Sequence, residues 1–425
     1  MSSKSSPYSA KFRMKRPARR AEEPAPISIP TPGIEKLKVT HYGMQLKNLS
    51  GVARFLKWHH DQDADYGLDS EVVPFFQRKS KERSLRIIPA KLSWRNSIIT
   101  ARRRFRKTPT RRPVPLAVYH DLWGIKFMAD LDQAERRIGI LHADFPNSEQ
   151  AFAEVRDLVD GVLCVSQPLL DIAEKVWPNL KGGRLELLPY PVDLPKGFER
   201  PPRKPGKPFT FGFCGRIQLE KKRVDRFPEL LDRLAAEGQS FRMEFLGDGY
   251  DAPELQRQLS IKHEVSFHGH RTGADYWNTL AGWDAIIFAS DAESMPMSLL
   301  DAISVGVLPV YPNLKDGGEA HVRMLDERLI YPEGNMAAAA EQLVRIRNMA
   351  AQQLAAIRKH CKEASAPHIG SNYFKVFSDF SRRISNLPRV SRGEFGKKPK
   401  TLVDWCPLGI VNKVRPLAIW KTRLG

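Results

Sequence analysis

Short apolar segments alternate with amphipathic segments along most of the chain. In the first half, apolar runs of strand length lie at 38–42, 114–119, 138–142 and 161–165, and helical patterns begin at Val52 and near 148. In the second half, the apolar runs lie near 208–215, 241–246, 264–268, 284–289, 308–311 and 328–331, separated by helical patterns at 224–237, 273–282, 297–305 and 335–350. Strands that alternate with helices predict parallel sheets covered on both faces. The fold class we expect is therefore α/β, with two facing Rossmann-like, doubly wound domains.

The stretch 189–208, PYPVDLPKGFERPPRKPGKP, separates the two series. It concentrates proline, glycine and charge, so no regular element persists there. A chain of 425 residues suits two domains of ordinary size. Four parts are expected: a basic arm, an N-terminal domain, a C-terminal domain, and a cross-over helix with a basic tail, at 1–36, 37–195, 206–365 and 366–425. The arm has the composition of a disordered segment, rich in Lys, Arg, Pro and Ser.

The net charge of +20 favours anionic partners. Most of the excess lies in the first 150 residues and beyond 365, and the run 78–113 is dominated by Arg and Lys. That run is either a solvated face with a loop, or a contact for anionic lipid or another polyanion. The tail, which carries Trp405 and Trp420, either anchors to an apolar partner or packs across the domain junction.

Cysteine spacing and hydropathy narrow the class of protein further. The four cysteines form no CxxC pair, so neither a zinc site nor a disulfide framework is indicated. The N-terminus has no apolar signal region, and no apolar run reaches the length of a membrane span. We expect a cytoplasmic protein that attaches peripherally to the inner face of the cytoplasmic membrane through its basic regions.

The segment Asp291-Ala-Glu-Ser-Met-Pro-Met-Ser-Leu-Leu-Asp301 directly follows an apolar strand. Ligands of open α/β sheets bind at the carboxyl ends of strands, and a helix N-terminus there offers free N–H groups to phosphate and hydroxyl oxygens. Glu293 and Asp301 flank that turn and suit the binding of sugar and ribose hydroxyls. The competing interpretation is an ordinary capping box from Ser298 to Asp301, with Glu293 a solvated loop charge.

Basic residues follow the first strand of the second domain, in Gly215-Arg-Ile-Gln-Leu-Glu-Lys-Lys222. Gly215 lets the backbone turn tightly, and Arg216 with Lys222 could neutralise a departing diphosphate. Isolated basic loop residues are more often simply solvated. In the first half, His120 and His142 each stand at the carboxyl end of a strand, where a histidine can donate to a substrate hydroxyl or carry a proton. A satisfied structural histidine is the competing interpretation for both.

Taken together, these segments resemble the retaining glycosyltransferase family 4, the glycosyl transferases group 1, of the GT-B fold. The resemblance is strongest over 208–312, where GRIQLEKKRVDRF, FLGDG, VSFHGH, DAIIFAS, ESMPMSLLDA and GVLPVY occur in order. It extends more weakly over 114–193 through AVYHDLWG, ILHAD, VDGVLCVSQPL and PYPVD.

The resemblance implies a role for each matching position. Glu293 holds the donor sugar hydroxyls, Asp301 binds the ribose diol, and Arg216 and Lys222 stabilise the leaving diphosphate in place of a metal. His120 sits beside the reacting sugar. The remaining binding positions act mainly through the backbone around sugar, phosphate or base: Gly51, Gly215, His270, Ser294, Met295, Pro296 and Met297. No cofactor and no metal are implied, and the donor substrate is a nucleoside diphosphate sugar.

Three positions depart from the family pattern. Asp301 is one methylene shorter than the usual glutamate, Gly51 stands where paired glycines are usual, and Tyr190-Pro191 replaces Asn-Gly. The implied reaction is hexosyl transfer to an acceptor hydroxyl, saccharide or lipid-linked, in cell-envelope polysaccharide or glycolipid synthesis. The alternatives are a non-catalytic GT-B binding protein at membrane or nucleic acid, and a sugar-nucleotide epimerase. No specific nucleic acid partner is expected for the enzyme.

Overall fold

The structure is a computed structural model, and the account below covers the residues whose placement it describes. These are 36–44, 46, 51–77, 87–108, 113–143, 148–180, 182–203, 206–238, 241–390, 405–408 and 410. The expected basic arm lies outside them up to Glu35, as do most of the tail, the basic stretch 78–86, and Asp144 of the ILHAD motif.

The first sheet contains six parallel strands in the order β2-β1-β3-β4-β5-β6. Its strands are β1 (Leu37–Gly43), β2 (Leu68–Pro74), β3 (Val114–His120), β4 (Ala134–Leu141), β5 (Gly161–Cys164) and β6 (Leu185–Leu187). The helices between them are α1 (Gly51–Gln62), η1 (Asp63–Tyr66), α2 (Ile98–Phe105), α3 (Ile125–Met128), α4 (Ser148–Ala153), η2 (Arg156–Leu158) and α5 (Gln167–Val176).

The second sheet also contains six parallel strands, in the order β12-β11-β10-β7-β8-β9. Its strands are β7 (Phe209–Cys214), β8 (Phe241–Leu246), β9 (Val265–Phe267), β10 (Ala285–Ile287), β11 (Leu308–Pro312) and β12 (Ile330–Tyr331). Its helices are α6 (Leu219–Lys222), η3 (Val224–Arg226), α7 (Phe227–Ala236), α8 (Ala252–Leu259), α9 (Gly273–Ala281), α10 (Met297–Ser304), α11 (Gly317–Leu325), η4 (Glu327–Leu329), α12 (Met336–Arg347) and α13 (Ala351–Ser365).

The strand order of each sheet reverses direction once. In the first sheet the reversal lies between β1 and β3, and in the second between β7 and β10. Right-handed crossovers that leave such a point in opposite directions place helices on both faces of the sheet. The prediction of two doubly wound sheets is confirmed. At each reversal the loops diverge and leave room for a ligand at the carboxyl edge.

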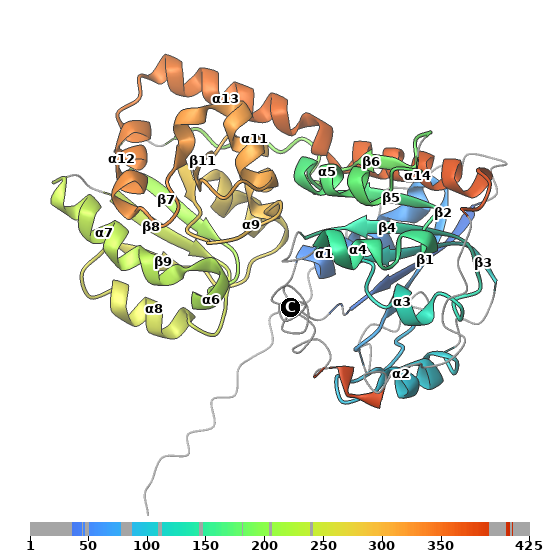
Figure 1. The fold of residues 1–425 in the computed structure, drawn as a ribbon. Coiled ribbons are helices and arrows are strands. Elements are labelled where there is room, and N and C mark those ends of the chain that lie inside the picture. The colour runs from blue at the N-terminus through green and yellow to red at the C-terminus, as the bar shows by residue number, and fades with distance from the viewer. Residues whose placement is uncertain are drawn as a thin grey trace, which may run out of the picture. The chain divides into compact units, whose positions relative to one another are not determined.

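Two chain segments connect the sheets. Residues 188–208 lead from the first to the second, and the chain returns through η5 (Ala366–His368) to α14 (Gly370–Asn386), which packs against β3 and β4 of the first sheet (Figure 1). The connections are hydrogen-bonded to each other: Val192 N donates to the His368 carbonyl over 2.7 Å, and Gly370 N donates to the Val192 carbonyl over 3.1 Å. The cross-over helix expected after residue 365 is therefore α14, which packs on the first sheet.

Some elements have no counterpart in the sequence pattern. Strand β2 reads LDSEVVP, is polar at its start, and ends in proline, which an edge strand with one partner tolerates. Helix α13 follows α12 after a short break and appeared in no prediction. The short apolar segment 85–89 could suit a strand, but its described residues make a single bridge, from Ile87 to Val72.

The basic run of the first half forms part of a helix. On α2 the apolar residues Ala101 and Phe105 are buried, whereas Arg103, Arg104 and Arg106 point to solvent. Exposed arginines are compatible with both interpretations of this run, the solvated face and the contact for anionic lipid or another polyanion. Within the described part of the chain, no helix combines the length and the apolar character needed to cross a membrane. All four cysteines are described, and each is a free thiol.

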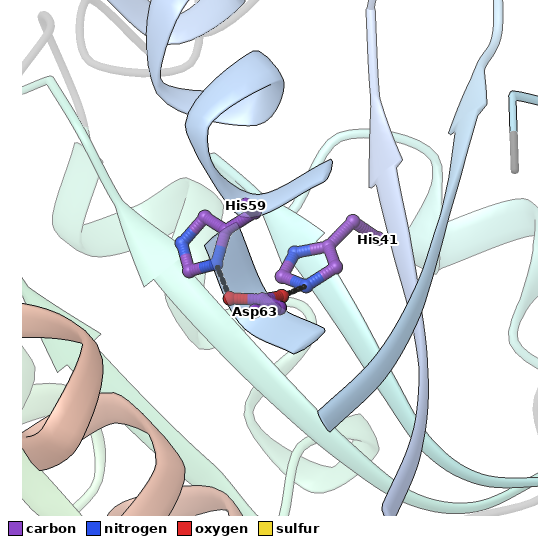
Figure 2. A group of neighbouring side chains, drawn as sticks. All are labelled: His41, His59 and Asp63. Carbon is purple, nitrogen blue, oxygen red and sulfur yellow. Dashed lines mark hydrogen bonds and ion pairs between the residues drawn. The ribbon is translucent and has the colours of Figure 1, made fainter. Parts of the chain in front are cut away.

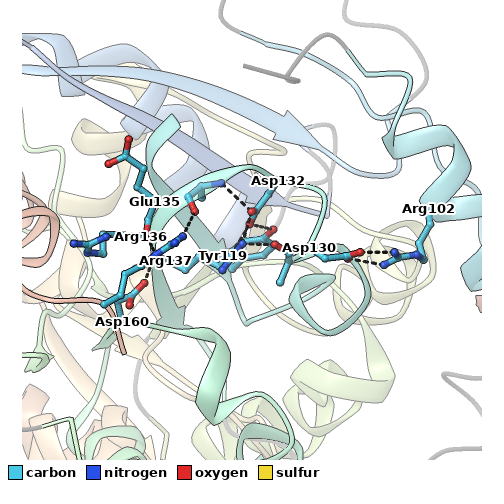
Figure 3. Close-up of polar contacts among 11 residues, drawn as sticks. Arg102, Tyr119, Asp130, Asp132, Glu135, Arg136, Arg137 and Asp160 are labelled. Carbon is cyan, nitrogen blue, oxygen red and sulfur yellow. Dashed lines mark hydrogen bonds and ion pairs between the residues drawn. The ribbon is translucent and has the colours of Figure 1, made fainter. Parts of the chain in front are cut away.

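A buried ionic network holds β3 and β4 together beneath the first sheet (Figure 3). The Arg137 guanidinium donates to both oxygens of Asp132 over 2.5–2.6 Å, and the Tyr119 hydroxyl donates to the same carboxylate over 2.8 Å. Asp132 is fully buried, and Arg137 is 4% exposed. A second pair, Arg102 with Asp130, lies nearer the surface and joins α2 to the loop before β4.

These two pairs should differ in energy because they differ in burial. We expect Asp132→Ala to lower the free energy of unfolding by about 3–5 kcal/mol, since it leaves the Arg137 charge buried without its partner. Asp130→Ala removes a partly exposed pair and should cost about 1 kcal/mol or less. Equilibrium urea unfolding of both variants measures the difference. Equal losses would contradict the assignment of Asp132 as the buried anchor.

Candidate functional site

The loops after β7 and β10 meet at the reversal point of the second sheet, because these strands are parallel neighbours. Lys222, at the end of α6, forms an ion pair with Glu293 in the loop after β10. The Ser290 hydroxyl donates to the same carboxylate oxygen over 2.7 Å. Both charged groups are half-buried. Two predicted site residues that lie 71 positions apart are thus in direct contact.

The turn after β7 depends on close backbone packing with the turn after β8. A Cβ added to Gly247 would lie 1.9 Å from the Gly215 carbonyl oxygen, and Gly247 has a φ of +141°. Gly215 N donates to the Leu246 carbonyl over 3.0 Å. The loop that carries Arg216 is therefore held by its backbone. The Arg216 side chain is partly exposed and contacts the Gln218 amide oxygen at 3.4 Å.

A second set of ion pairs fixes the start of the loop after β10. Asp291 accepts from Arg223 and from Arg226, each at 2.6 Å. Arg226 also donates to the Ala289 carbonyl over 2.6 Å. Asp291 is exposed, and its neighbouring arginines lower the pKa of its carboxyl against the opposing effect of burial. Its two ion pairs therefore account for Asp291 as a residue that holds the loop.

Asp301 lies in the interior of α10 and is 1% exposed. Its Oδ2 accepts from the Tyr276 hydroxyl over 2.5 Å and from Arg54 over 2.9 Å. Its Oδ1 is buried and has no hydrogen-bond partner within the described residues. Buried carboxylate oxygens are rarely left unpaired, so this oxygen suits a ligand hydroxyl. Helix α10 begins at Met297 after Pro296, so the capping box from Ser298 is wrong.

Asp301 is a buried carboxylate that pairs with the partly exposed Arg54. Burial acts to lower the pKa of Arg54, but the facing Asp301 carboxylate outweighs it and raises that pKa. Burial, reinforced by Asp301, raises the pKa of Tyr276 well above its usual range. Tyr276 therefore remains a neutral hydrogen-bond donor. Arg54 also stacks on Trp58, with its guanidinium carbon 4.5 Å from the ring centre.

The segment between Glu293 and α10 is held by the start of α11. Gly318 N donates to the Ser294 carbonyl over 3.2 Å, and Met295 and Pro296 are buried. Asp316 caps α11 by accepting from Glu319 N over 2.8 Å. Burial raises the pKa of the Asp316 carboxyl to about 7. The predicted backbone contacts at Ser294–Met297 thus lie in a segment with a defined path.

The remaining binding positions differ in their surroundings. Gly51 is the exposed first residue of α1, and a Cβ there would lie 3.1 Å from the Met297 sulfur. His270 is exposed and follows Gly269, whose carbonyl accepts from Gly247 N over 2.9 Å. Gly51 is therefore adjacent to the α10 segment. Within the described residues, no hydrogen bond or ion pair joins His270 to Glu293 or Lys222, and its role stays a prediction.

His120 ends β3 at the reversal point of the first sheet, but its ring points inward. It is 2% exposed, and both ring nitrogens are within hydrogen-bond distance of other histidines. Its Nε2 lies 3.2 Å from Nδ1 of His41, and its Nδ1 lies 2.8 Å from Nε2 of His142. Neither nitrogen is available to a substrate hydroxyl in this conformation. The interpretation of both histidines as satisfied side chains matches these contacts, and the catalytic role of His120 stays a prediction.

His41, His59 and Asp63 form a cluster (Figure 2), and His41 connects it to His120. Its potential ligand atoms all lie within 4.8 Å of one another, which is compatible with a metal ion. However, Asp63 accepts from His41 Nε2 at 3.2 Å and from His59 Nδ1 at 2.9 Å. The hydrogen bonds satisfy all three side chains, which are completely buried. The cluster is therefore explained without a cation.

The turn after His120 has an unusual backbone. Asp121 and Leu122 both adopt φ +54°, a left-handed conformation that residues with a side chain rarely take in succession. Asp121 Oδ1 accepts from His142 N over 2.7 Å, and burial raises the pKa of this carboxyl to about 6. Strain of this kind persists only where surrounding contacts impose it, and it concentrates at functional sites.

Comparison with known families gives a match over the elements of the second sheet. Residues 208–348 match the model of glycosyl transferases group 1. Two curated relatives are lipopolysaccharide 1,6-galactosyltransferases, from Salmonella typhimurium and from Escherichia coli, each 30% identical over 114 or 115 residues. The matches cover 25% of this chain and 31% of each relative. The chain thus spans about a third of the length of the curated relatives it matches.

Solved structures show the fold over most of the chain. The apo form of the lipopolysaccharide outer core galactosyltransferase WaaB is similar with a TM-score of 0.60 and 19% identity, covering 81% of this chain and all of that one. Sucrose-phosphate synthase from Thermosynechococcus elongatus is similar with a TM-score of 0.65 and 14% identity, covering 82% of this chain and 99% of that one. The protein has the GT-B fold, as the sequence predicted.

Three residues of the site were missed by sequence reasoning. Ser290, Tyr276 and Arg54 contact Glu293 or Asp301 and were given no role there, although Ser290 ends the DAIIFAS segment. Ser290 could have been considered because it follows the strand directly. Tyr276 and Arg54 gave no signal, since their positions relative to Asp301 depend on how α9 and α1 pack.

The buried histidines should make the protein sensitive to acid. Burial lowers the pKa of His41 to about 4 and of His142 to about 3, below the ordinary 6.5. The unfolded chain therefore binds more protons below pH 6.5, so stability is present above that pH and is lost as the pH falls toward 4. We expect His142→Gln to show a shallower loss of unfolding free energy between pH 6.5 and 4 than the wild type.

Urea unfolding across that pH range measures the slope. His360→Gln is the matched control, because His360 is exposed on α13. Asp121, with its raised pKa, acts in the opposite direction in both proteins, so the difference between variants isolates the histidine. Identical slopes in wild type and His142→Gln would contradict the prediction.

Proposed function

We propose that this protein is a retaining glycosyltransferase of family 4 that moves a sugar from a nucleoside diphosphate sugar to an acceptor hydroxyl in cell-envelope polysaccharide or glycolipid synthesis. The observation that carries the proposal is the pairing of Lys222 with Glu293 at the reversal point of the second sheet, together with Asp301 Oδ1, which has no hydrogen-bond partner within the described residues. The match of this region to glycosyl transferases group 1 and the curated lipopolysaccharide galactosyltransferases support it.

The donor site would use the contacts already described. Glu293 accepts hydrogen bonds from the sugar hydroxyls, while Ser290 and Lys222 hold its carboxylate in place. Lys222 and Arg216 supply positive charge to the diphosphate as its bond to the sugar breaks. Because these groups are held before the reaction, little reorganisation is required when charge develops.

The nucleoside would bind at Asp301, on the side of the diphosphate opposite the sugar. Asp301 Oδ1 is a buried acceptor without a partner in the described residues, and a ribose hydroxyl would satisfy it. Tyr276 and Arg54 hold the other carboxylate oxygen, which orients the shorter aspartate side chain. This support compensates for the methylene that distinguishes Asp301 from glutamate.

We assign the transfer retention of configuration through attack on the face from which the diphosphate leaves. On this assignment, leaving-group oxygens receive the acceptor proton, and the protein contributes cations and orientation rather than a covalent nucleophile. The buried ring of His120 supports this assignment, because neither nitrogen is free for proton transfer. Product analysis by NMR distinguishes retention from inversion and separates transfer from epimerisation.

Substitution of Glu293 and of Arg216 tests the proposed function. We expect Glu293→Gln and Arg216→Ala to lower the turnover number about 100- to 1000-fold, the effect of removing one preorganised electrostatic contact. Glu229→Gln, on the exposed face of α7, should leave turnover unchanged. Transfer from UDP-, GDP- and ADP-sugars is measured together with thermal shifts, since a donor at 100 times its Kd stabilises by about 2.7 kcal/mol.

The outcomes of that screen separate the alternatives. A thermal shift with one donor, together with sugar transfer that Glu293→Gln reduces, supports the proposed glycosyltransferase activity. A shift without transfer or hydrolysis favours a non-catalytic binding protein. No shift with any donor would contradict the proposed donor site.

We also propose that the exposed basic face of α2 attaches the protein to anionic membrane at the cytoplasmic side. Arg103, Arg104 and Arg106 are exposed on one helix, and each basic residue near anionic lipid contributes about 1 kcal/mol. We expect flotation with vesicles containing phosphatidylglycerol, lost with neutral vesicles or in high salt. Arg103→Ser combined with Arg106→Ser should weaken it, whereas Arg257→Ser, exposed on α8, should not. Binding that ignores charge and salt would refute the attachment.

A further inference from the structure

Seven buried side chains form one continuous hydrogen-bonded chain beneath the carboxyl edge of the first sheet. Each successive contact lies between 2.8 and 3.2 Å, and no member is more than 4% exposed. The order is Tyr190, His142, His120, His41, Asp63, His59 and Tyr373. The carboxylate of Asp63 is the branch point, and His41 and His59 approach its two oxygens (Figure 2).

The position of every proton in this chain follows from Asp63. Burial acts to raise the pKa of its carboxyl, but the two histidines outweigh burial and hold that pKa well below its usual range. An ionised carboxylate only accepts hydrogen bonds, so His41 donates from Nε2 and His59 donates from Nδ1. Burial lowers the pKa of His41 to about 4, so this ring is a neutral imidazole with one proton, and its Nδ1 accepts.

The same rule extends to His120 and His142. His41 Nδ1 must accept from His120 Nε2, and His120 Nδ1 must then accept from His142 Nε2. His142 Nδ1 finally accepts from the Tyr190 hydroxyl over 2.8 Å. One buried charge therefore selects the same Nε2–H tautomer in three consecutive histidines. The other branch ends where His59 Nε2 accepts from Tyr373 over 3.0 Å, and it does not pass through His120.

The chain supports the strained turn at the end of β3. Asp121 and Leu122, at φ +54°, directly follow His120, and Asp121 accepts from His142 N. Both histidines that flank this turn belong to the chain, and their ring planes are stacked, 9° apart with centroids 5.1 Å apart. Tyr190 lies on the segment that leads to the second sheet, so the turn is also tied to that connection.

We propose that Asp63 is a positioning residue: through His41 it fixes the tautomer and orientation of His120, and thereby holds the Asp121–Leu122 turn in the shape that sugar transfer requires. This inference rests on the proposed function for its catalytic consequence, but not for the proton order. Asp63 touches no substrate. Its effect reaches the site only through the ordered rings.

The proton order can be measured in the unmodified protein. Nitrogen-15 NMR of histidine-labelled protein near pH 7.5 should show His41, His120 and His142 as Nε2–H tautomers and His59 as the Nδ1–H tautomer. The opposite state of His59 is an internal control, because both branches end on the same carboxylate. Protonation of His120 at Nδ1 would overturn the proposal. Loss of the Nε2 proton of His41 on adding Zn²⁺, with transfer unchanged or increased, would instead assign the cluster as a metal site and overturn it too.

Asp63→Asn tests the catalytic consequence. The asparagine NH₂ donates where the carboxylate accepted, so it cannot satisfy both histidines in the same proton order. We expect the turnover number to fall about ten- to hundredfold, the usual effect of losing a supporting contact behind a functional group. The Kd for the donor should change little, because the side chains proposed to contact the donor, Glu293, Lys222, Arg216 and Asp301, follow strands of the second sheet.

Tyr373→Phe is the matched comparison, since it removes a buried hydroxyl of the branch that bypasses His120. We expect its turnover number to stay within about twofold of the wild type, with all histidine tautomers unchanged. Equal losses of turnover in the two variants, following their loss of thermal stability, would reduce Asp63 to a structural role. If the wild type transfers no sugar, the proposed function fails, while the NMR measurement still decides the proton order.

Discussion

Every strand pairing within the two sheets is parallel, and this constraint places all the loops that carry chemistry. In a parallel sheet the carboxyl ends of neighbouring strands open onto the same edge, so residues far apart in sequence meet there. Lys222 and Glu293 meet because β7 and β10 are neighbours on either side of the reversal in strand order. His41, His120 and His142 meet for the same reason on β1, β3 and the end of β4.

Buried charge is used differently in the two sheets. In the first, Asp132 and Asp63 are completely enclosed and fully hydrogen-bonded, one by Arg137 and Tyr119, the other by histidines and Ser70. In the second, Glu293 is only half-buried and Asp301 keeps one oxygen without a partner in the described residues. A satisfied carboxylate stabilises its surroundings, whereas an incompletely satisfied one is suited to a ligand.

This contrast gives the two sheets complementary properties. The group 1 glycosyltransferase match covers the sheet with the open acceptor oxygen. The other sheet carries the closed chain of histidines and the strained turn at Asp121. The first sheet therefore carries rigid, hydrogen-bonded polar groups, whereas the second carries a buried acceptor oxygen without a partner among the described residues.

The pattern of apolar runs was enough to predict both doubly wound sheets, because strand and helix periodicities are local and each run is buried by its own spacing. It also predicted that the carboxyl edge of the second sheet carries Gly215, Arg216, Lys222, Glu293 and Asp301, because loops that follow parallel strands open onto that edge. Strand β2 was not predicted, because its burial comes from β1 and α1 rather than from its own LDSEVVP pattern.

The direction in which a side chain points could not be predicted from the sequence either. His120 was expected to face a substrate, yet its ring lies between His41 and His142, and His59 and Asp63 attracted no attention although they are four residues apart. The contacts of this hydrogen-bonded chain join residues up to 314 positions apart, as between His59 and Tyr373. Only the packing of α1, α14 and three strands around the Asp63 carboxylate brings these residues together.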